Sequence, residues 1–176
     1  MEVRGKKQKK EGSLFYEEVF RALNKNKVKY AVAGGVAAVM HGAVRFTVDL
    51  DIIVDMKPQN IDKLFMTFQS LGYLPRVPVT KDQFKDPKNR RALMEKKNMK
   101  AFSFFHRNNP LNIVDLLLDN VAQFTKVKKI QLRAGGLSVP VVSLGTLKKM
   151  KRKAGRDKDL LDLELIEKIE KHTGHG

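Results

Sequence analysis

Two acidic residues inside an apolar segment restrict the possible folds of this chain more than any other feature. Residues 30–55 read YAVAGGVAAVMHGAVRFTVDLDIIVD: an apolar run that ends in two glycines, a short apolar segment, and a second apolar run that carries Asp49 and Asp51. Residues i and i+2 of a β-strand point to the same face, so the two carboxylates project together. The sequence therefore predicts a strand whose apolar residues hold it in a sheet while its two acids meet solvent.

These two carboxylates repel each other unless a cation lies between them, and hard oxygen ligands suit Mg²⁺ or Mn²⁺. The alternative is an ion pair with nearby Arg45. Gly34 and Gly35 stand where the first strand meets a helix, a position at which backbone N–H groups can approach a phosphate. A plain turn is the alternative there, as expected for Gly135-Gly136 in a hairpin. A phosphate site beside a divalent-metal site predicts nucleotide chemistry.

A third carboxylate, Asp115, lies in the apolar run NIVDLLL. If that strand neighbours the one with Asp49 and Asp51, the three acids complete a site for two metal ions, as in two-metal phosphoryl transfer. The competing acid, Asp119, falls at the end of the run, where we expect it to cap the next segment. His41 follows an apolar helix, and we expect it to pack rather than to catalyse.

Helical and strand patterns along the rest of the chain predict an α+β fold, a mixed α/β arrangement of a β-sheet flanked by helices. We expect helices at 13–24, 36–41 and 58–70 and two after residue 143, and strands at 28–33, 48–54, 100–105, 112–118, 127–133 and 137–142. Ser13 and Ser143 are the expected N-caps. Three prolines within residues 74–98 predict a loop or a short helix, and Asn109-Pro110 predicts a turn.

At 176 residues the chain is expected to form one main domain. Residues 1–12 are predicted to be a basic, flexible N-terminal arm, residues 13–142 the core, and residues 143–176 a C-terminal helical segment that packs on it. The last helix is expected to pack through an apolar face that includes Leu161 and Ile169.

The charge balance narrows the choice of partners. Lys and Arg number 35 against 19 Asp and Glu, a net charge of +16 that attracts nucleotides, RNA or DNA, or an acidic protein. Solubility or heat resistance is the alternative reason for such a balance. The absence of cysteine excludes disulfides and thiolate metal sites. Because no apolar run is long enough to span a bilayer and the first residues lack the apolar core of a signal peptide, we expect a cytoplasmic protein without membrane contact.

The order and spacing of these motifs resemble the signature of the DNA polymerase beta-type nucleotidyltransferase superfamily. Gly34-Gly35 is followed, after thirteen intervening residues, by an Asp-Leu-Asp-Ile run that begins at Asp49. The preceding RFT, with Arg45 and Thr47, is similar to minimal and AbiEii-type nucleotidyltransferases. The tail KRKAGRDKDLLDL also resembles their closing helices, with matching positions at Lys151, Arg156, Asp159 and Asp162.

This resemblance implies an Mg²⁺- or Mn²⁺-dependent enzyme that moves a nucleoside monophosphate from an NTP to a hydroxyl group and releases pyrophosphate. The metal ligands and catalytic residues would be Asp49, Asp51 and Asp115, with Asp115 also helping to deprotonate the hydroxyl. The nucleotide-binding residues would be Gly34, Gly35, Arg45, Thr47 and Lys151. Asp159 and Asp162 would orient basic residues rather than bind metal. Arg45 pairing with an acid and Lys151 facing water are the alternatives.

One position departs from the family pattern. Many active members carry Ser or Thr after the diglycine, whereas this chain has Val36. A second interpretation therefore stays open, in which an inactive nucleotidyltransferase fold binds nucleotide, nucleic acid or a partner protein. The acceptor is an RNA end, a protein side chain or a small molecule, and the positive charge favours RNA or a protein, as in toxin–antitoxin systems. The sequence does not specify an oligomeric state.

Overall fold

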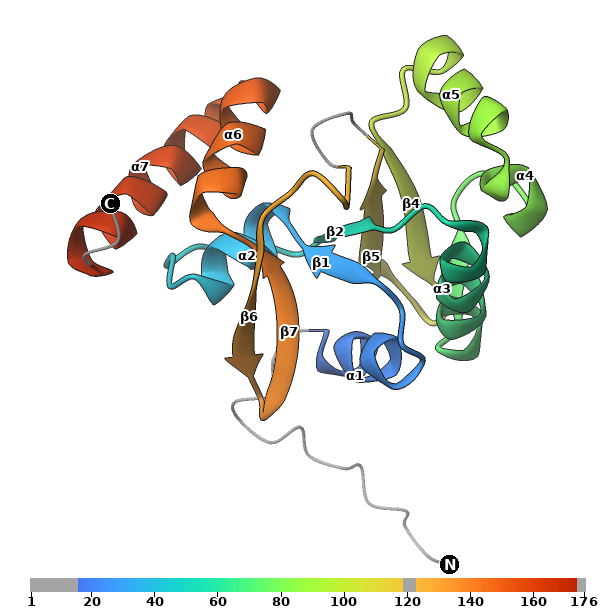
Figure 1. Ribbon diagram of the computed structural model, residues 1–176, viewed down its shortest axis with the longest axis horizontal. Helices are drawn as coiled ribbons and strands as arrows, with labels where there is room; N and C mark the ends of the chain where they lie inside the picture. The colour runs from blue at the N-terminus through green and yellow to red at the C-terminus, as the bar shows by residue number, and fades with distance from the viewer. Residues whose placement is uncertain (1–15, 119–122, 174–176) are drawn as a thin grey trace, which may run out of the picture.

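The computed structural model describes residues 16–118 and 123–173, which form a mixed β-sheet flanked by helices, as the sequence predicted (Figure 1). The helices are α1 (Glu17–Lys25), α2 (Gly34–Met40), α3 (Pro58–Ser70), α4 (Lys81–Lys85), α5 (Pro87–Lys96), α6 (Leu144–Ala154) and α7 (Asp157–Thr173). The strands are β1 (Tyr30–Val32), β2 (Leu50–Val54), β3 (Tyr73–Pro75), β4 (Ala101–His106), β5 (Asn109–Leu117), β6 (Lys129–Ala134) and β7 (Leu137–Val142).

The seven strands lie in the order β3-β4-β5-β2-β1-β7-β6. Two contacts in the sheet are parallel, β2 with β5 and β1 with β7, and the others are antiparallel. The central strands β1 and β2 are almost entirely apolar and buried, as is usual for strands that have neighbours on both edges and helices over them. The partly exposed Asp51 interrupts this pattern, and it is therefore a candidate functional residue of β2.

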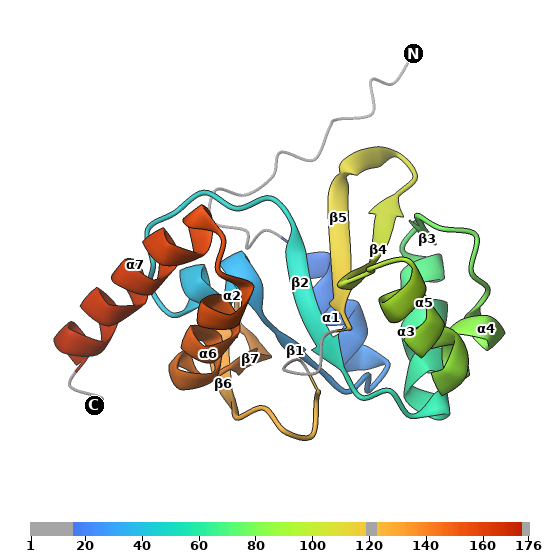
Figure 2. The ribbon, with the colours of Figure 1, turned by 90° about the horizontal axis from the view of Figure 1, so that it is seen from above.

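The helices form two groups on either side of the central strands. Helices α2, α6 and α7 lie together at one side, and α3, α4 and α5 lie at the other (Figures 1 and 2). Ser143 accepts a hydrogen bond from the backbone N–H of Thr146, so the predicted N-cap of α6 is confirmed. No helix in the described ranges is both long enough and apolar enough to cross a membrane.

Several predicted details differ from the structure. Of the two alternatives predicted for residues 74–98, a loop or a short helix, the structure has the second and holds two helices after β3, because Thr80 forms a capping box with Gln83 and Asp86 caps a helix that starts at Pro87. The turn predicted at Asn109-Pro110 lies earlier, at residues 107–108, and both residues belong to β5. The cap predicted at Ser13, the arm at 1–12 and Asp119 lie outside the described residues.

The packing face predicted for the last helix is also partly wrong. Leu161 is 63% exposed, whereas Ile166, Asp159 and Asp162 are buried. The helix is turned toward the rest of the protein by its acids, because these two carboxylates pair with basic side chains of other segments. An apolar spacing rule does not take such ion pairs into account.

Candidate active site

Two carboxylates lie side by side in the centre of the sheet. Asp51 on β2 and Asp115 on β5 are direct partners in the parallel register. Burial raises the pKa of Asp51 to about 6, and the negative charge of Asp115 adds to the rise against the opposing charge of Lys151. Burial also raises the pKa of Asp115, although Ser103 donates a hydrogen bond to it. Both acids are therefore held where their charged form is costly in the absence of a cation.

Asp115 has an acceptor atom that is not used. Within the part of the chain that the structure describes, its Oδ1 is buried and has no hydrogen-bond partner. A buried polar atom without a partner costs free energy, on the order of 1–3 kcal/mol. A divalent cation between Asp51 and Asp115 would satisfy this oxygen and neutralise both carboxylates, so the pair fits the hard-ligand chemistry of Mg²⁺.

Asp49 occupies a different position from the other two acids. It lies one residue before β2 and is exposed, although its negative charge contributes to the raised pKa of both Asp51 and Asp115. Among residues 16–118 and 123–173, no group of three or more His, Cys, Asp or Glu side chains is close enough together to hold a metal ion. The structure thus brings two of the three predicted ligands together and places the third at their edge, so the three-carboxylate site stays a prediction.

The diglycine forms the first turn of α2, two residues earlier than the sequence predicted. Gly34 has a φ of +60°, and a methyl group in place of its hydrogen would overlap Oδ2 of Asp51. A methyl group on Gly35 would lie 2.5 Å from Oγ1 of Thr47. The helix can therefore start against both side chains only because these positions have none. Val36, in contrast, is buried in the core, and its side chain has no hydroxyl to offer to the site.

Replacing Gly34 by alanine is expected to destabilise the protein by about 1–2 kcal/mol from the left-handed backbone alone, and to displace Asp51 as well. Divalent-metal binding, measured by Mn²⁺ titration, should fall sharply. Gly136→Ala is the matched control, because Gly136 also has a positive φ of +79° but has no atom within 4 Å of the added methyl group. Equal metal affinity in the two variants would contradict the close approach of Gly34 to Asp51.

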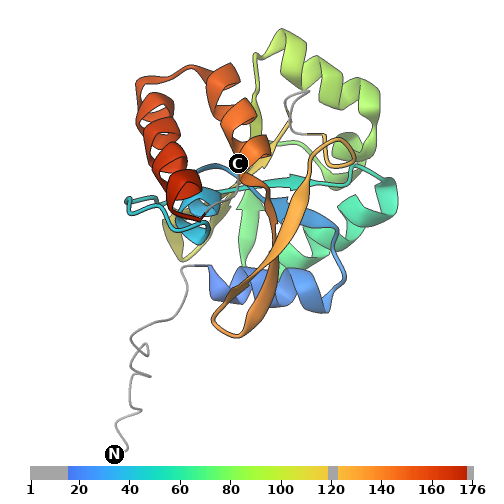
Figure 3. The same ribbon diagram turned by 60° about the vertical axis from the view of Figure 1, so that its left-hand side comes forward.

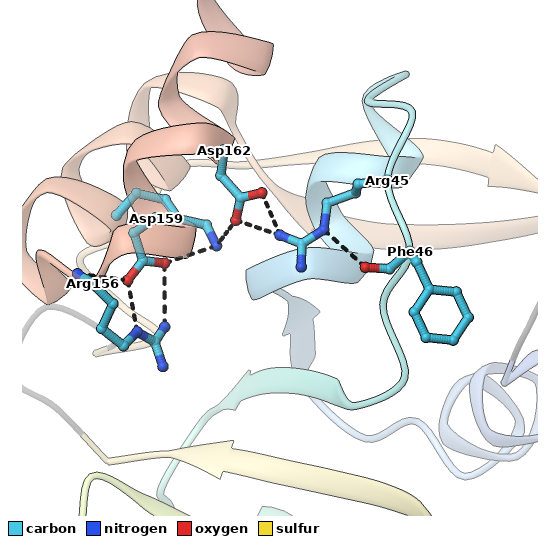
Figure 4. Close-up of polar contacts among 6 residues, drawn as sticks. Arg45, Phe46, Arg156, Asp159 and Asp162 are labelled. Carbon is cyan, nitrogen blue, oxygen red and sulfur yellow. Dashed lines mark hydrogen bonds and ion pairs between the residues drawn. The ribbon is translucent and has the colours of Figure 1, made fainter.

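A buried network of ion pairs connects the end of the chain to the α2–β2 loop (Figure 4). Lys151 is buried on α6, and its Nζ pairs with Asp159, at 3.2 Å, and with Asp162. Asp162 also pairs with Arg45. Asp159 accepts from Nε of Arg156 at 2.7 Å. Burial raises the pKa of Asp159, but the hydrogen bonds from Arg156 and Lys151 outweigh it and leave that pKa below its usual range.

This network decides between the alternatives for its basic residues. Arg45 pairs with an acid, and the interpretation in which Lys151 faces water is wrong, because its side chain is only 7% exposed. Asp159 and Asp162 orient basic side chains. Phe46, next to Arg45, points away from the network and is 86% exposed (Figure 4). His41 contacts the carbonyl oxygen of Val142 at 2.8 Å, in agreement with a packing role.

A cavity of about 360 Å³ opens in front of the paired carboxylates. Its wall contains three acids, four basic residues and an apolar part: Gly34, Asp51, Lys100, Ala101, Asp115, Leu117, Leu147, Met150, Lys151, Lys153, Ala154, Arg156 and Asp159. The volume is in the range of ligand sites, and such a mixture of apolar wall and convergent charges is typical of them. Arg45 and Thr47 do not line this cavity. Arg45 instead pairs with Asp162, and Oγ1 of Thr47 lies beside Gly35.

Sequence reasoning missed Lys100, Lys153 and Tyr16. The two lysines gave no signal, because a lysine beside a strand or near a helix end is common on any surface. The Tyr16 hydroxyl lies 2.6 Å from the carbonyl oxygen of Val48 and 2.9 Å from that of Ile113, and it donates to one of them at a time. It thereby joins β5 to the residue that precedes Asp49, an arrangement that depends on contacts distant in sequence.

Solved structures share the fold of this chain, although its sequence matches no family model and no curated protein. LnuA, a lincosamide antibiotic adenylyltransferase with lincomycin bound, has a TM-score of 0.58 at 15% identity, over 86% of this chain and 94% of that one. ANT(2″)-Ia, an antibiotic-resistance factor, gives 0.59 at 12% identity, over 89% and 85%. An antigenic nucleotidyltransferase-like protein from Paracoccidioides brasiliensis gives 0.51 at 15%, over 85% and 72%.

These likenesses show that the chain has the nucleotidyltransferase fold, as its motifs predicted. At identities of 12–15% they establish the fold and not the reaction. The narrower resemblance to AbiEii-type proteins stays a prediction.

Proposed function

We propose that this protein transfers a nucleoside monophosphate from an NTP to a hydroxyl acceptor and releases pyrophosphate. The observation that carries the proposal is the pair formed by Asp51 and Asp115, with an unsatisfied carboxylate oxygen, at the wall of a cavity that also holds four basic residues. Opposite charges placed together in one cavity suit a phosphate group and the cation that accompanies it. The fold neighbours LnuA and ANT(2″)-Ia, the latter solved with adenylyl-2″-tobramycin, support the same class of reaction.

Basic residues of the cavity are assigned to the triphosphate, and acidic residues to the metal. Lys100, Lys153 and Arg156 neutralise the triphosphate, while Gly34 leaves room for the carboxylate of Asp51 at the cavity wall. Asp51 and Asp115, with Asp49 from the strand edge, would hold Mg²⁺ or Mn²⁺. When bound, the metal would offset the charge on the attacking and leaving oxygens.

The chemical step forms one bond and breaks one. The acceptor oxygen bonds to the α-phosphorus, the bond from that phosphorus to the bridging oxygen of the β-phosphate breaks, and pyrophosphate leaves. The hydroxyl proton passes to Asp115, whose raised pKa makes it a better base than an exposed carboxylate. Positioning and charge neutralisation supply most of the rate.

A second function, binding without turnover, has its own support. Val36 offers no hydroxyl, and Arg45 and Lys151, which the family resemblance assigns to the triphosphate, are engaged by acids instead. On this interpretation the site binds nucleotide, nucleic acid or a partner, as in a toxin–antitoxin pair, but releases no pyrophosphate.

Calorimetric titration of each NTP, with and without Mg²⁺, tests both functions on the wild type and on Asp51→Asn. We expect at least one NTP to bind only with metal and only to the wild type, and pyrophosphate to appear when acceptors are added. Metal-dependent binding without pyrophosphate release across RNA, protein and small-molecule acceptors would favour the second function. No binding of any NTP would overturn nucleotidyl transfer and leave only the binding of nucleic acid or a partner protein.

A further inference from the structure

The positive charge of this protein is concentrated in two segments. Residues 87–100 hold six basic residues against one acidic, and residues 144–154 hold five against none, so the two segments account for ten of the sixteen net positive charges. In contrast, α7 carries six acidic residues and three lysines. A chain that is basic for solubility alone would spread its charge more evenly over the surface.

The fold brings these two segments to opposite sides of one cavity. Lys100 and Ala101, which follow α5, line it from one side, and Met150, Lys153 and Ala154 of α6 line it from the other. Figures 1 and 3 show α5 and α6 facing each other across this side of the molecule. The segments are more than forty residues apart in sequence, so their charge meets only in the folded protein.

Some of this charge is already used inside the protein. Arg90 donates to the carbonyl oxygens of Phe84 and Lys85, Lys148 pairs with Glu170, and Lys151 belongs to the buried network. Exposed basic residues in or beside the two segments form two groups, each with members that line the cavity, and one of these members, Arg156, also pairs with Asp159. The first basic cluster is Lys96, Lys97 and Lys100, and the second is Lys149, Lys153 and Arg156.

We propose that the acceptor is a polynucleotide strand, which lies along both basic clusters and places its terminal hydroxyl at Asp51 and Asp115. A single triphosphate in a 360 Å³ cavity can contact the basic residues that line it, but Lys96, Lys97 and Lys149 stand outside. An anion that extends beyond the cavity on both sides uses them all, and a phosphate backbone has this form. Their charge would repel a cationic acceptor. This inference rests on the proposed function for the hydroxyl transfer, but not for binding.

Fluorescence anisotropy without NTP tests the inference with a labelled 20-nucleotide single-stranded RNA, and with DNA of the same sequence, between 50 and 200 mM KCl. The variants are Lys96→Gln/Lys97→Gln for the first cluster and Lys149→Gln/Lys153→Gln for the second. The matched control, Lys25→Gln/Arg133→Gln, removes two exposed charges from α1 and the β6–β7 hairpin, away from α5 and α6 (Figure 1). Each cluster variant should bind more weakly and flatten the log–log salt slope by about 1.4, at roughly 0.7 per lost phosphate contact.

The outcomes separate this inference from the proposed function. Equal losses in the cluster variants and the control would mean diffuse attraction and would overturn the polynucleotide site. A poly-glutamate peptide that binds with the same cluster dependence while RNA and DNA do not would assign the clusters to an acidic protein. If neither nucleic acid binds while the wild type nucleotidylates tobramycin and releases pyrophosphate, the proposed function stands and the inference fails. Binding of RNA or DNA alone identifies the kind of strand.

Discussion

Replacing Asp51 by asparagine is expected to abolish nucleotidyl transfer and, at the same time, to make the protein more stable. Transfer should fall on the order of 10³-fold, because a metal ligand contributes several kcal/mol to the transition state. Stability should rise by about 1–2 kcal/mol at pH 8, a value below the full pKa shift because Asp51 is partly exposed. The gain arises because asparagine removes a charge that burial and Asp115 oppose.

The pH dependence gives this prediction a definite sign. The pKa of Asp51 is raised from 3.8 to about 6 in the folded protein, so the folded state holds the proton more tightly than the unfolded state does. Stability of the wild type is therefore lost as pH rises from about 4 to 6, and Asp51→Asn escapes that loss. Urea unfolding without metal should show no difference between the two proteins below pH 4 and a constant difference above pH 7.

A matched control removes a carboxylate that is exposed and whose pKa is lowered rather than raised. Asp82 is exposed, and its hydrogen bond from Lys85 lowers its pKa, so Asp82→Asn should bring no gain in stability at any pH. A destabilised Asp51→Asn at pH 8 would contradict the view that Asp51 and Asp115 oppose each other. It would mean that both acids are stabilised in the folded protein without metal.

Replacing Asp162 by asparagine is expected to have the largest effect on stability. Asp162 is 3% exposed and is the shared partner of Lys151 and Arg45. Its loss leaves a buried lysine with one acid and Arg45 without its carboxylate, which should cost about 3 kcal/mol, in the range for breaking a buried ion pair from one side. Guanidinium unfolding measures the change, and Arg21→Gln, in an exposed pair with Glu17, is the control that should change little.

A double-mutant cycle shows whether the cost comes from the uncompensated charge. In Asp162→Asn alone, Arg45 keeps its charge but loses its carboxylate. Adding Arg45→Met removes that unpaired charge, so the double variant should be more stable than the sum of the single changes predicts. Strict additivity would mean that the two side chains do not interact. NTP binding should weaken in Asp162→Asn as well, because Lys151 is placed in the cavity by this acid.

Local signals in the sequence were sufficient for many elements. The alternation around β2, the diglycine hairpin between β6 and β7, and the Ser143 cap of α6 each depend on residues close together in the chain. The same kind of signal existed for α4 and α5, in the Thr80–Gln83 capping box and in Asp86-Pro87, but the prolines of that segment left a loop as an alternative to a short helix. These helices were therefore predictable in principle.

The site depended on contacts that local patterns do not contain. That Asp51 and Asp115 are partners requires β5 to lie parallel to β2, and the apolar run around Asp115 made this neighbourhood possible without determining it. The pairing of Arg45 with Asp162 joins positions 117 residues apart. Leu161 was placed on the packing face because apolar spacing was counted without the acids, whose buried partners decide how α7 is turned.

The strand order also restricts the order in which parts of the chain can fold. β1 gains its second neighbour only when Val32 meets Val141, and β2 gains its second neighbour from β5. Contacts so distant in sequence must overcome a large loss of chain entropy before they stabilise the sheet, so we infer slow folding. A growing chain that ends before residue 137 carries the most apolar strand of the protein as an open edge, which can pair with another copy. The segment from residue 137 onward thus completes the cavity and also protects the centre of the sheet from aggregation.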